Sequence, residues 1–220
     1  MKHIIIIFSL IIAPVIYADK PSDQLKHGLA AHYFSDPFQW DGNWPDSISV
    51  PSTDPALWTF KNYSYSRIEP LINHQFIRHG WFSIRWKGFL DTRHDRSEND
   101  RKTKKGADYI FEIHADDGCR LIIDGKLIID DWCPCSEKSA GFIRKSAAIF
   151  LEDGLHEIIV EYFQGQSLEK QDKDPMKLFW QSEEMHIPRQ IIPASHFFHN
   201  SEQAENPYRT SISNLNNDRK

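Results

Sequence analysis

The sequence predicts an all-β protein, an antiparallel β-sandwich with long polar loops. Apolar and polar side chains alternate along several short segments, which is the pattern of half-buried strands. Three Asp-Gly pairs, at 117–118, 124–125 and 153–154, lie between such segments. Asp-Gly favours a hairpin turn because glycine readily adopts the positive φ that these turns require. No long segment has apolar residues at helical spacing.

The first 18 residues are typical of a secretory signal peptide. Lys2 precedes an apolar run from Ile4 to Ile12, and Pro14 and the small residue Ala18 follow. The alternative, a transmembrane anchor, needs roughly 20 apolar residues, and this run is shorter and is interrupted by proline. We therefore expect residues 1–18 to be cleaved off, the protein to be secreted or periplasmic, and the mature chain to contain no membrane span.

The first half of the mature chain contains two predicted strands. Residues 28–34 are apolar, and residues 81–90 alternate, so that Phe82, Ile84 and Trp86 share one face. Residues 35–58 are rich in Pro, Asp, Ser and Trp, which indicates an irregular segment. We expect the tryptophans of this part, Trp40, Trp44 and Trp58, to pack the segment onto the sandwich rather than to stack on sugar.

The second half contains most of the predicted sheet. Residues 91–107 have almost no apolar side chain, so we expect a long mobile loop there. Strands are predicted around the three Asp-Gly hairpins, and residues 176–180 form the predicted last strand. One domain should cover residues 25–198, and the polar residues 199–220 should be a disordered tail.

Three cysteines remain in a chain that we expect to be exported. With Cys119, Cys133 and Cys135 at most one internal disulfide can form, and the oxidising setting favours it. A Cys133–Cys135 bridge would close a very small ring across Pro134. Cys119 bridged to Cys133 or Cys135 fits better, and three unpaired thiols are the alternative. The spacing does not favour zinc.

Charge and motifs exclude several classes of function. The formal net charge is −5, whereas a nucleic-acid-binding protein needs a basic face to neutralise phosphates. The sequence has no GxSxG, HExxH, phosphate-loop or dinucleotide-binding motif. We therefore expect a protein that is not an enzyme and that binds no nucleic acid.

Asp116 and Asp117 form the candidate metal site. Two adjacent carboxylates repel each other, so they need either full solvation or a cation. Calcium suits them because it is a hard ion that gathers about 6–8 oxygen ligands. The alternative is that Asp117-Gly118 is a plain hairpin corner with Asp116 solvated beside it.

The chain resembles the protective-antigen-type (PA-14) domain, and the matching segments occur in family order. These segments are Gly28 to Phe34, Phe82 to Gly88, Ala115 to Gly125 (ADDGCRLIIDG), Asp131-Trp132, Leu151 to Tyr162 (LEDGLHEIIVEY) and Leu178 to Trp180. The long segments 40–80 and 91–107 depart from the family pattern, and residues 164–175 lack its usual glycine cluster.

The resemblance implies a β-sandwich and a role in carbohydrate recognition. In some sugar-binding members a cis peptide joins two aspartates that hold calcium, and Asp116 and Asp117 match that pair. The resemblance thus implies calcium as cofactor and a glycan as partner, with the loop from Gln164 to Asp174 as a source of further oxygen ligands. The alternative is a structural or protein-interaction domain that keeps the fold without sugar binding, because a fold alone does not establish a function.

Overall fold

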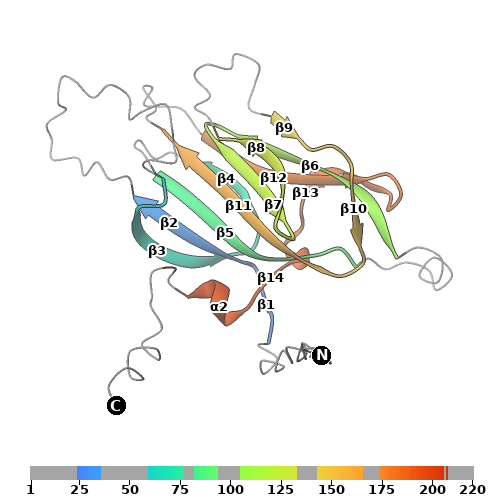
Figure 1. The fold of residues 1–220 in the computed structure, drawn as a ribbon, viewed down its shortest axis with the longest axis horizontal. Coiled ribbons are helices and arrows are strands. Elements are labelled where there is room, and N and C mark those ends of the chain that lie inside the picture. Colours follow the sequence, from blue (N-terminus) through green and yellow to red (C-terminus); the bar gives the residue numbers. More distant parts are fainter. Residues whose placement is uncertain are drawn as a thin grey trace, which may run out of the picture.

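Two antiparallel sheets pack face to face in a computed structural model of the protein (Figure 1). The structure describes residues 24–35, 59–76, 82–93, 105–132, 143–165, 174–205 and 207. The predicted all-β sandwich is therefore confirmed.

The larger sheet has eight strands in the described part of the chain, in the order β3-β2-β5-β11-β7-β8, with β14 beside β5 and β1 beside β14. Their bounds are β1 (Lys26–His27), β2 (Leu29–Ser35), β3 (Asn62–Glu69), β5 (Phe82–Asp91), β7 (Cys119–Ile123), β8 (Lys126–Asp131), β11 (Leu155–Gln164) and β14 (Phe197–His199). The longest pairing joins β5 and β11 over ten residues, from Leu155 opposite Asp91 to Gln164 opposite Phe82.

The smaller sheet has six strands within the described ranges and is built around the β6–β12 pair. Its strands are β4 (Asn73–Phe76), β6 (Gly106–Ala115), β9 (Ile143–Lys145), β10 (Ile149–Glu152), β12 (Asp174–Ser182) and β13 (Ile187–Ile191). β9 and β10 both pair with β6, and β4 and β13 both pair with β12.

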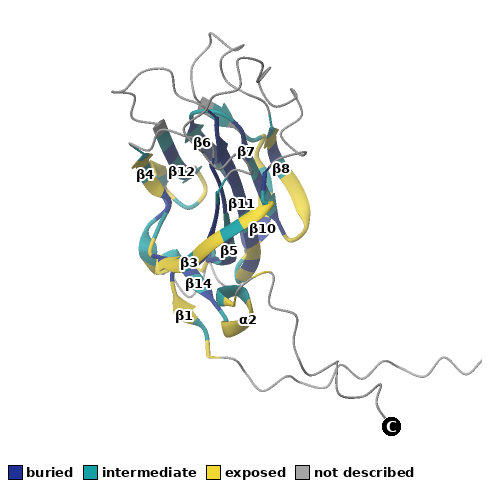
Figure 2. Ribbon diagram, turned by 90° about the vertical axis from the view of Figure 1, so that its left-hand side faces the viewer, coloured by how far each residue is buried: buried dark blue, intermediate teal, exposed yellow. Residues whose placement is uncertain are grey.

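The core lies between the two sheets, where Figure 2 shows the buried residues in dark blue. The predicted alternation is confirmed in β5, since Phe82, Ile84 and Trp86 are all buried. It is also confirmed in β6 and β7, where the buried residues are Tyr109, Phe111, Ile113, Ala115, Cys119, Leu121 and Ile123. Trp86 and Trp180 are the largest fully buried side chains and come from different sheets.

The hairpin interpretation of the Asp-Gly pairs is correct for one of the three. Asp124 and Gly125 join β7 to β8, and both have positive φ, 49° and 74°. The other two pairs do not form hairpins. Asp117-Gly118 joins β6 to β7, and Asp153-Gly154 joins β10 to β11, and in both cases the two strands belong to different sheets. These pairs are corners at which the chain crosses from the small sheet to the large one.

The C-terminal part differs from the prediction in two ways. Residues 176–180 lie in β12, which is not the last strand, because β13 and β14 follow it. The structure also describes residues 200–205, although we expected the disordered tail to begin at residue 199. After η3 (Ala194–His196) and β14, the short helix α2 (Ser201–Ala204) is capped by Asn200, whose side chain accepts a hydrogen bond from the Gln203 amide.

Several expectations concern residues outside the described ranges. These are residues 1–18, the three tryptophans of segment 35–58, Cys133 and Cys135, and most of the loops 91–107 and 164–174. Cys119 is buried in β7, as its alternating pattern predicts, and lies directly opposite Asp131, two residues before Cys133. Among the described residues, no helix has the length and apolar character that a membrane span requires.

Candidate functional site

The predicted metal site, Asp116 and Asp117, forms the corner between β6 and β7. Both side chains are half-buried. We expected a cis peptide between them, and this expectation was wrong, because the described residues contain no cis peptide bond. Asp117 instead adopts the left-handed backbone conformation, with φ 59°. Aspartate tolerates this region better than most residues do, so the turn forms without the cost of a non-proline cis bond.

The corner packs tightly against the end of β11. The Phe163 amide donates to the Gly118 carbonyl at 3.0 Å. A Cβ atom at position 118 would lie 1.9 Å from Cε1 of Phe163, which is itself fully buried. Glycine is therefore required at position 118 because of this close approach.

Backbone amides orient both carboxylates of the corner. Oδ1 of Asp116 accepts the Asp117 amide at 2.9 Å, and Oδ2 of Asp117 accepts the Gly165 amide at 2.6 Å. Gly165 follows β11 directly and is the second residue of the loop that we expected to supply further ligands. The structure thus brings Asp117 into contact with the beginning of that loop.

Arg144 of β9 also holds the corner through hydrogen bonds. Its Nη1 donates to the Ala115 carbonyl, and its Nη2 donates to the Asp117 carbonyl at 3.2 Å. Its Nε donates to the Asp131 carboxylate at 2.5 Å. Sequence reasoning missed this residue, since Arg144 is 27 positions from Asp117 and matches no motif.

Trp132 is a half-exposed aromatic residue that contacts Phe163, the side chain packed against Gly118. Its ring lies edge-on to Phe163, with 4.8 Å between centroids, and stacks on Phe60 at 5.6 Å. The Arg120 guanidinium lies 4.6 Å from the centre of the same ring. Trp132 is thus held in a fixed orientation beside the candidate site.

The donor chemistry of the corner fits calcium, although two carboxylates do not complete its shell. Both side chains offer hard oxygen atoms and both reach solvent. Within the described ranges, no group of three or more His, Cys, Asp or Glu side chains is placed to hold a metal ion. The remaining ligands would be carbonyl oxygens, water molecules or residues of the loop 166–173, which lies outside those ranges.

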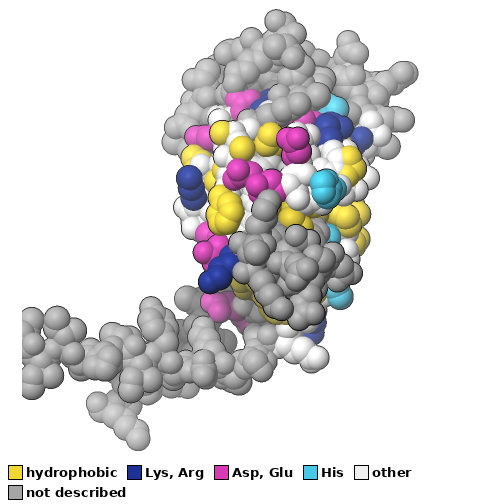
Figure 3. Space-filling view, turned by 90° about the vertical axis from the view of Figure 1, so that its right-hand side faces the viewer, with side chains coloured by type: hydrophobic (Ala, Val, Ile, Leu, Met, Phe, Trp, Pro, Cys, Tyr) yellow, Lys and Arg dark blue, Asp and Glu magenta, His cyan; other side chains and the backbone are white. Residues whose placement is uncertain are grey.

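Acidic, basic and hydrophobic side chains of the described residues are interspersed on one face of the molecule (Figure 3). Two residues before Asp116, burial lowers the pKa of His114, and the positive charge of Lys177 on the neighbouring strand lowers it further.

Comparison with known proteins identifies the fold family. The PA14 domain family matches residues 77–189. The chain is 30% identical over 148 residues to the anti-sigma-I factor RsgI3 of Acetivibrio thermocellus, a match that covers 63% of this chain and 19% of that protein. The chain therefore spans about a fifth of the length of this relative.

Solved PA14 domains share the architecture at low sequence identity. The PA14 domain of the antifreeze protein MpAFP has a TM-score of 0.56 and 14% identity, and the match covers 87% of this chain and 99% of that one. A PA14 sugar-binding domain from an RTX adhesin has a TM-score of 0.53 and 13% identity, covering 79% and 99%. An anti-sigma factor domain-containing protein gives 0.56 and 24%, covering 83% and 52%. These structural likenesses concern the fold alone.

The two packed sheets and the corners that join them define a β-sandwich module of the PA14 type. The family match spans more than half of the chain, from residue 77 to residue 189. The chain belongs to the PA14 domain family, as the sequence motifs predicted, and this family is not a catalytic one.

Proposed function

We propose that the chain is a secreted or periplasmic carbohydrate-binding module that binds a glycan with the help of calcium at the Asp116–Asp117 corner, and that it is not an enzyme. Asp116 and Asp117 would hold the ion, together with oxygen ligands from the loop between Gln164 and Asp174. Calcium, when bound, would offer coordination positions to a pair of sugar hydroxyls.

One observation supports this proposal more than any other. The Asp117 carboxylate is hydrogen-bonded to the first backbone amide after β11, at Gly165. The corner and the residue that follows β11 are therefore neighbours although 48 positions separate them. A ligand that touches the Asp117 carboxylate would also lie beside Gly165.

The comparisons support the ligand class. A PA14 domain described as sugar-binding shares this fold. Two epithelial adhesin domains of Candida glabrata, solved with β-lactose and with Galβ1-3GlcNAc, match it with TM-scores of 0.50.

The test is a glycan array on the mature protein, with calcium and with a chelator, followed by calorimetry with calcium. We expect glycan binding that the chelator abolishes, and calcium heat in the wild type that is lost in Asp117→Ala. Asp117→Asn separates charge from shape, since an amide oxygen can still accept the Gly165 amide while the charge is gone. Asp108→Ala is the matched control, because Asp108 is exposed at the other end of β6.

Two results would reject the proposal: no calcium heat in the wild type, or equal heats in the wild type and Asp117→Ala. A second candidate function would then be favoured, namely a protein-interaction domain without sugar binding. The specific observation behind it is the 30% identity to part of RsgI3, which is an anti-sigma-I factor.

A further inference from the structure

Arg144 carries a buried positive charge. The proposed binding of calcium and a glycan does not explain why it is there. Its side chain is only 9% exposed, and that of its ion-pair partner Asp131 is 13% exposed. Burying an ion pair rarely stabilises a fold more than a well-packed apolar pair would. General stability therefore does not explain why this position carries an arginine.

The strand pairing explains why the arginine points into the sandwich. β9 pairs with β6, and Arg144 lies opposite Ile113, a fully buried core residue. Directly opposite residues of an antiparallel pair share one face, so the Arg144 side chain enters the space between the sheets. There it reaches the ends of two strands, β6 at Ala115 and β8 at Asp131.

The guanidinium group bonds both to backbone carbonyl groups and to a carboxylate. Two nitrogen atoms donate to the carbonyl groups of Ala115 and Asp117, which are on either side of Asp116. The third nitrogen donates to the Asp131 carboxylate, which balances the charge. A planar guanidinium can make these three bonds at once, whereas a lysine ammonium could not do so with the same geometry.

We propose that Arg144 is a positioning residue that holds the Asp116–Asp117 corner in one conformation before any ligand arrives. The proposal rests on the proposed function for its consequence, which is tighter calcium binding. Fixing the two carbonyls fixes the backbone from which both carboxylates extend. A preorganised site then loses less conformational entropy when it binds.

The positive charge of Arg144 also repels calcium, and this repulsion would weaken calcium binding. The Asp131 carboxylate lies 2.5 Å from Nε of Arg144, so the pair carries no net charge and its field decays steeply. The gain from ordering therefore outweighs the repulsion. The two effects predict opposite changes when the arginine is removed.

The experiment measures calcium affinity by calorimetry in Arg144→Gln and in the double variant Arg144→Gln/Asp131→Asn. The double variant removes both charges together, which guards against misfolding caused by a lone buried carboxylate. We expect about tenfold weaker calcium binding in both, since ordering one residue of backbone costs about as much as a tenfold change in a binding constant. Arg144→Lys should restore only part of the affinity.

Arg93→Gln is the matched control. Arg93 is also an ion-paired arginine, with Asp91 at 2.7 Å, but it lies at the other end of the sandwich, where β11 begins opposite Asp91. We expect its calcium affinity to stay within about twofold of the wild type. Unchanged or tighter binding in the Arg144 variants would overturn the proposal.

Hydrogen exchange without calcium separates this proposal from the proposed function. The amides of Asp117 and Gly165 are bonded to the two carboxylates of the corner and should exchange at least tenfold faster in the double variant. The amide of Val160, in the centre of β11, should not change. If the wild type binds no calcium, the proposed function fails and the exchange rates still decide the role of Arg144. Equal exchange at Asp117 and Gly165 would refute that role.

Discussion

Single glycines at the sandwich corners have different physical roles, although their sequence contexts look alike. Gly118 and Gly154 both follow an aspartate, and both lie where the chain crosses between sheets. A Cβ at Gly118 would collide with Phe163, whereas a Cβ at Gly154 would meet no atom within 4 Å. Only the structure distinguishes the two, because the clash involves a residue 45 positions away in the sequence.

We therefore expect Gly118→Ala to lower the free energy of unfolding by about 1–3 kcal/mol, since overpacking forces shifts in a close-packed core. Gly154→Ala should be neutral or stabilising by less than about 1 kcal/mol, because alanine reduces the entropy of the unfolded chain. Urea unfolding of both variants measures the difference. Equal stabilities would contradict the required close approach at Gly118.

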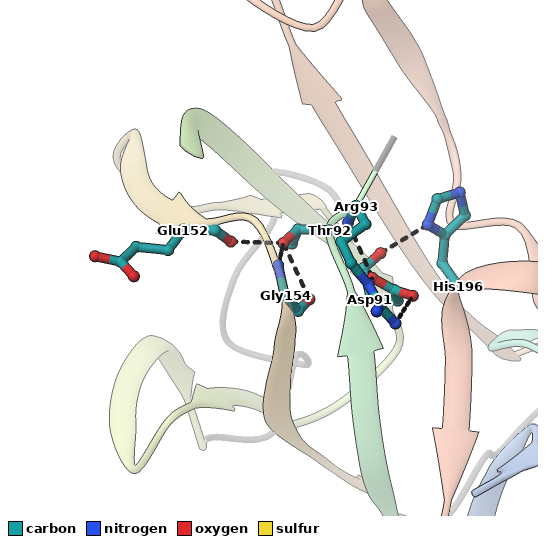
Figure 4. A network of polar contacts seen from close by, with 6 residues as sticks. All are labelled: Asp91, Thr92, Arg93, Glu152, Gly154 and His196. Carbon is teal, nitrogen blue, oxygen red and sulfur yellow. Dashed lines mark hydrogen bonds and ion pairs between the residues drawn. The ribbon is translucent and has the colours of Figure 1, made fainter. Parts of the chain in front are cut away.

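Thr92 fixes the other cross-sheet corner. Its buried hydroxyl donates to the Glu152 carbonyl at 2.7 Å and accepts the Gly154 amide at 3.1 Å (Figure 4). Its own amide donates to the Gly154 carbonyl at 2.9 Å. In the same cluster, Asp91 is paired with Arg93, and its carbonyl accepts a hydrogen bond from His196 at 2.7 Å. This cluster lies at the start of β11, and the Asp116–Asp117 corner lies at the other end of that strand.

Replacing Thr92 by valine keeps the shape of the side chain and removes the hydroxyl group. The Gly154 amide then loses this partner, and the Glu152 carbonyl keeps its bond to His156. We expect a loss of about 1 kcal/mol in the free energy of unfolding, the net contribution of a typical hydrogen bond. Thr92→Ser, which keeps the hydroxyl, should lose less than the valine variant. The reverse order in urea unfolding would refute this role.

At the scale of elements, alternation predicted the strands well, and turn chemistry did not predict their connections. The spacing of Tyr109, Phe111 and Ile113 predicts β6, because every second side chain of a strand points to the same face. An Asp-Gly pair reports only a local backbone conformation. Whether the next strand pairs with the previous one depends on long-range partners, such as β12 for β6 and β11 for β7. The hairpin prediction therefore fails at the two Asp-Gly pairs that form corners between the sheets.

The sequence did not predict the helix α2, because the helix is held on the large sheet by a buried histidine that is distant in sequence. His32 of β2 is only 2% exposed. Its Nε2 donates to the Gln203 carbonyl at 2.9 Å, and its Nδ1 accepts the Ser66 hydroxyl at 2.6 Å. Burial lowers the pKa of His32, the bond to Gln203 opposes this, and the charges of Lys87 and Arg85 add to the lowering.

The lowered pKa of His32 predicts an acid-sensitive contact. The unfolded chain takes up the proton first, near pH 6.5. The stability that the neutral imidazole contributes is therefore complete above that pH and is lost as the pH falls through the folded pKa, by at most about 1.4 kcal/mol per pH unit. Urea unfolding from pH 8 to pH 5 should show this slope in the wild type and a smaller one in His32→Gln. Identical slopes would contradict it.

At the scale of the whole molecule, the fold was predictable and the site only partly so. Family motifs point to Asp116 and Asp117 as the candidate site, and this assignment stays a prediction. The contact to Gly165 and the Arg144 bonds arise where the ends of β6, β7, β8 and β11 meet β9 at one end of the sandwich. Which strand ends lie together depends on the register of both sheets, and a local sequence pattern does not predict that register.

The two sheets are also joined by a buried carboxylate at the opposite side of the large sheet. Glu69 of β3 accepts from Tyr33, Arg67 and Trp86, at 2.5, 2.6 and 2.5 Å. Its Oε2 lies 2.8 Å from Nε2 of His74, which belongs to β4 in the small sheet. Burial alone would raise the pKa of Glu69, but the bonds from His74, Tyr33 and Trp86 outweigh burial and lower it to about 2.

This lowered pKa predicts how the sandwich responds to acid. Above the ordinary value of 4.5 the Glu69 carboxylate contributes its full stability, and that contribution is lost as the pH falls toward about 2. We expect Glu69→Gln to be less stable than the wild type by roughly 2–3 kcal/mol at pH 7, with the gap closing between pH 4.5 and pH 2. Glu157→Gln, at an exposed position of β11, should follow the wild type throughout. A gap that stays constant down to pH 2 would show that Glu69 acts by shape rather than by charge, because only a charge effect disappears when the carboxylate is protonated.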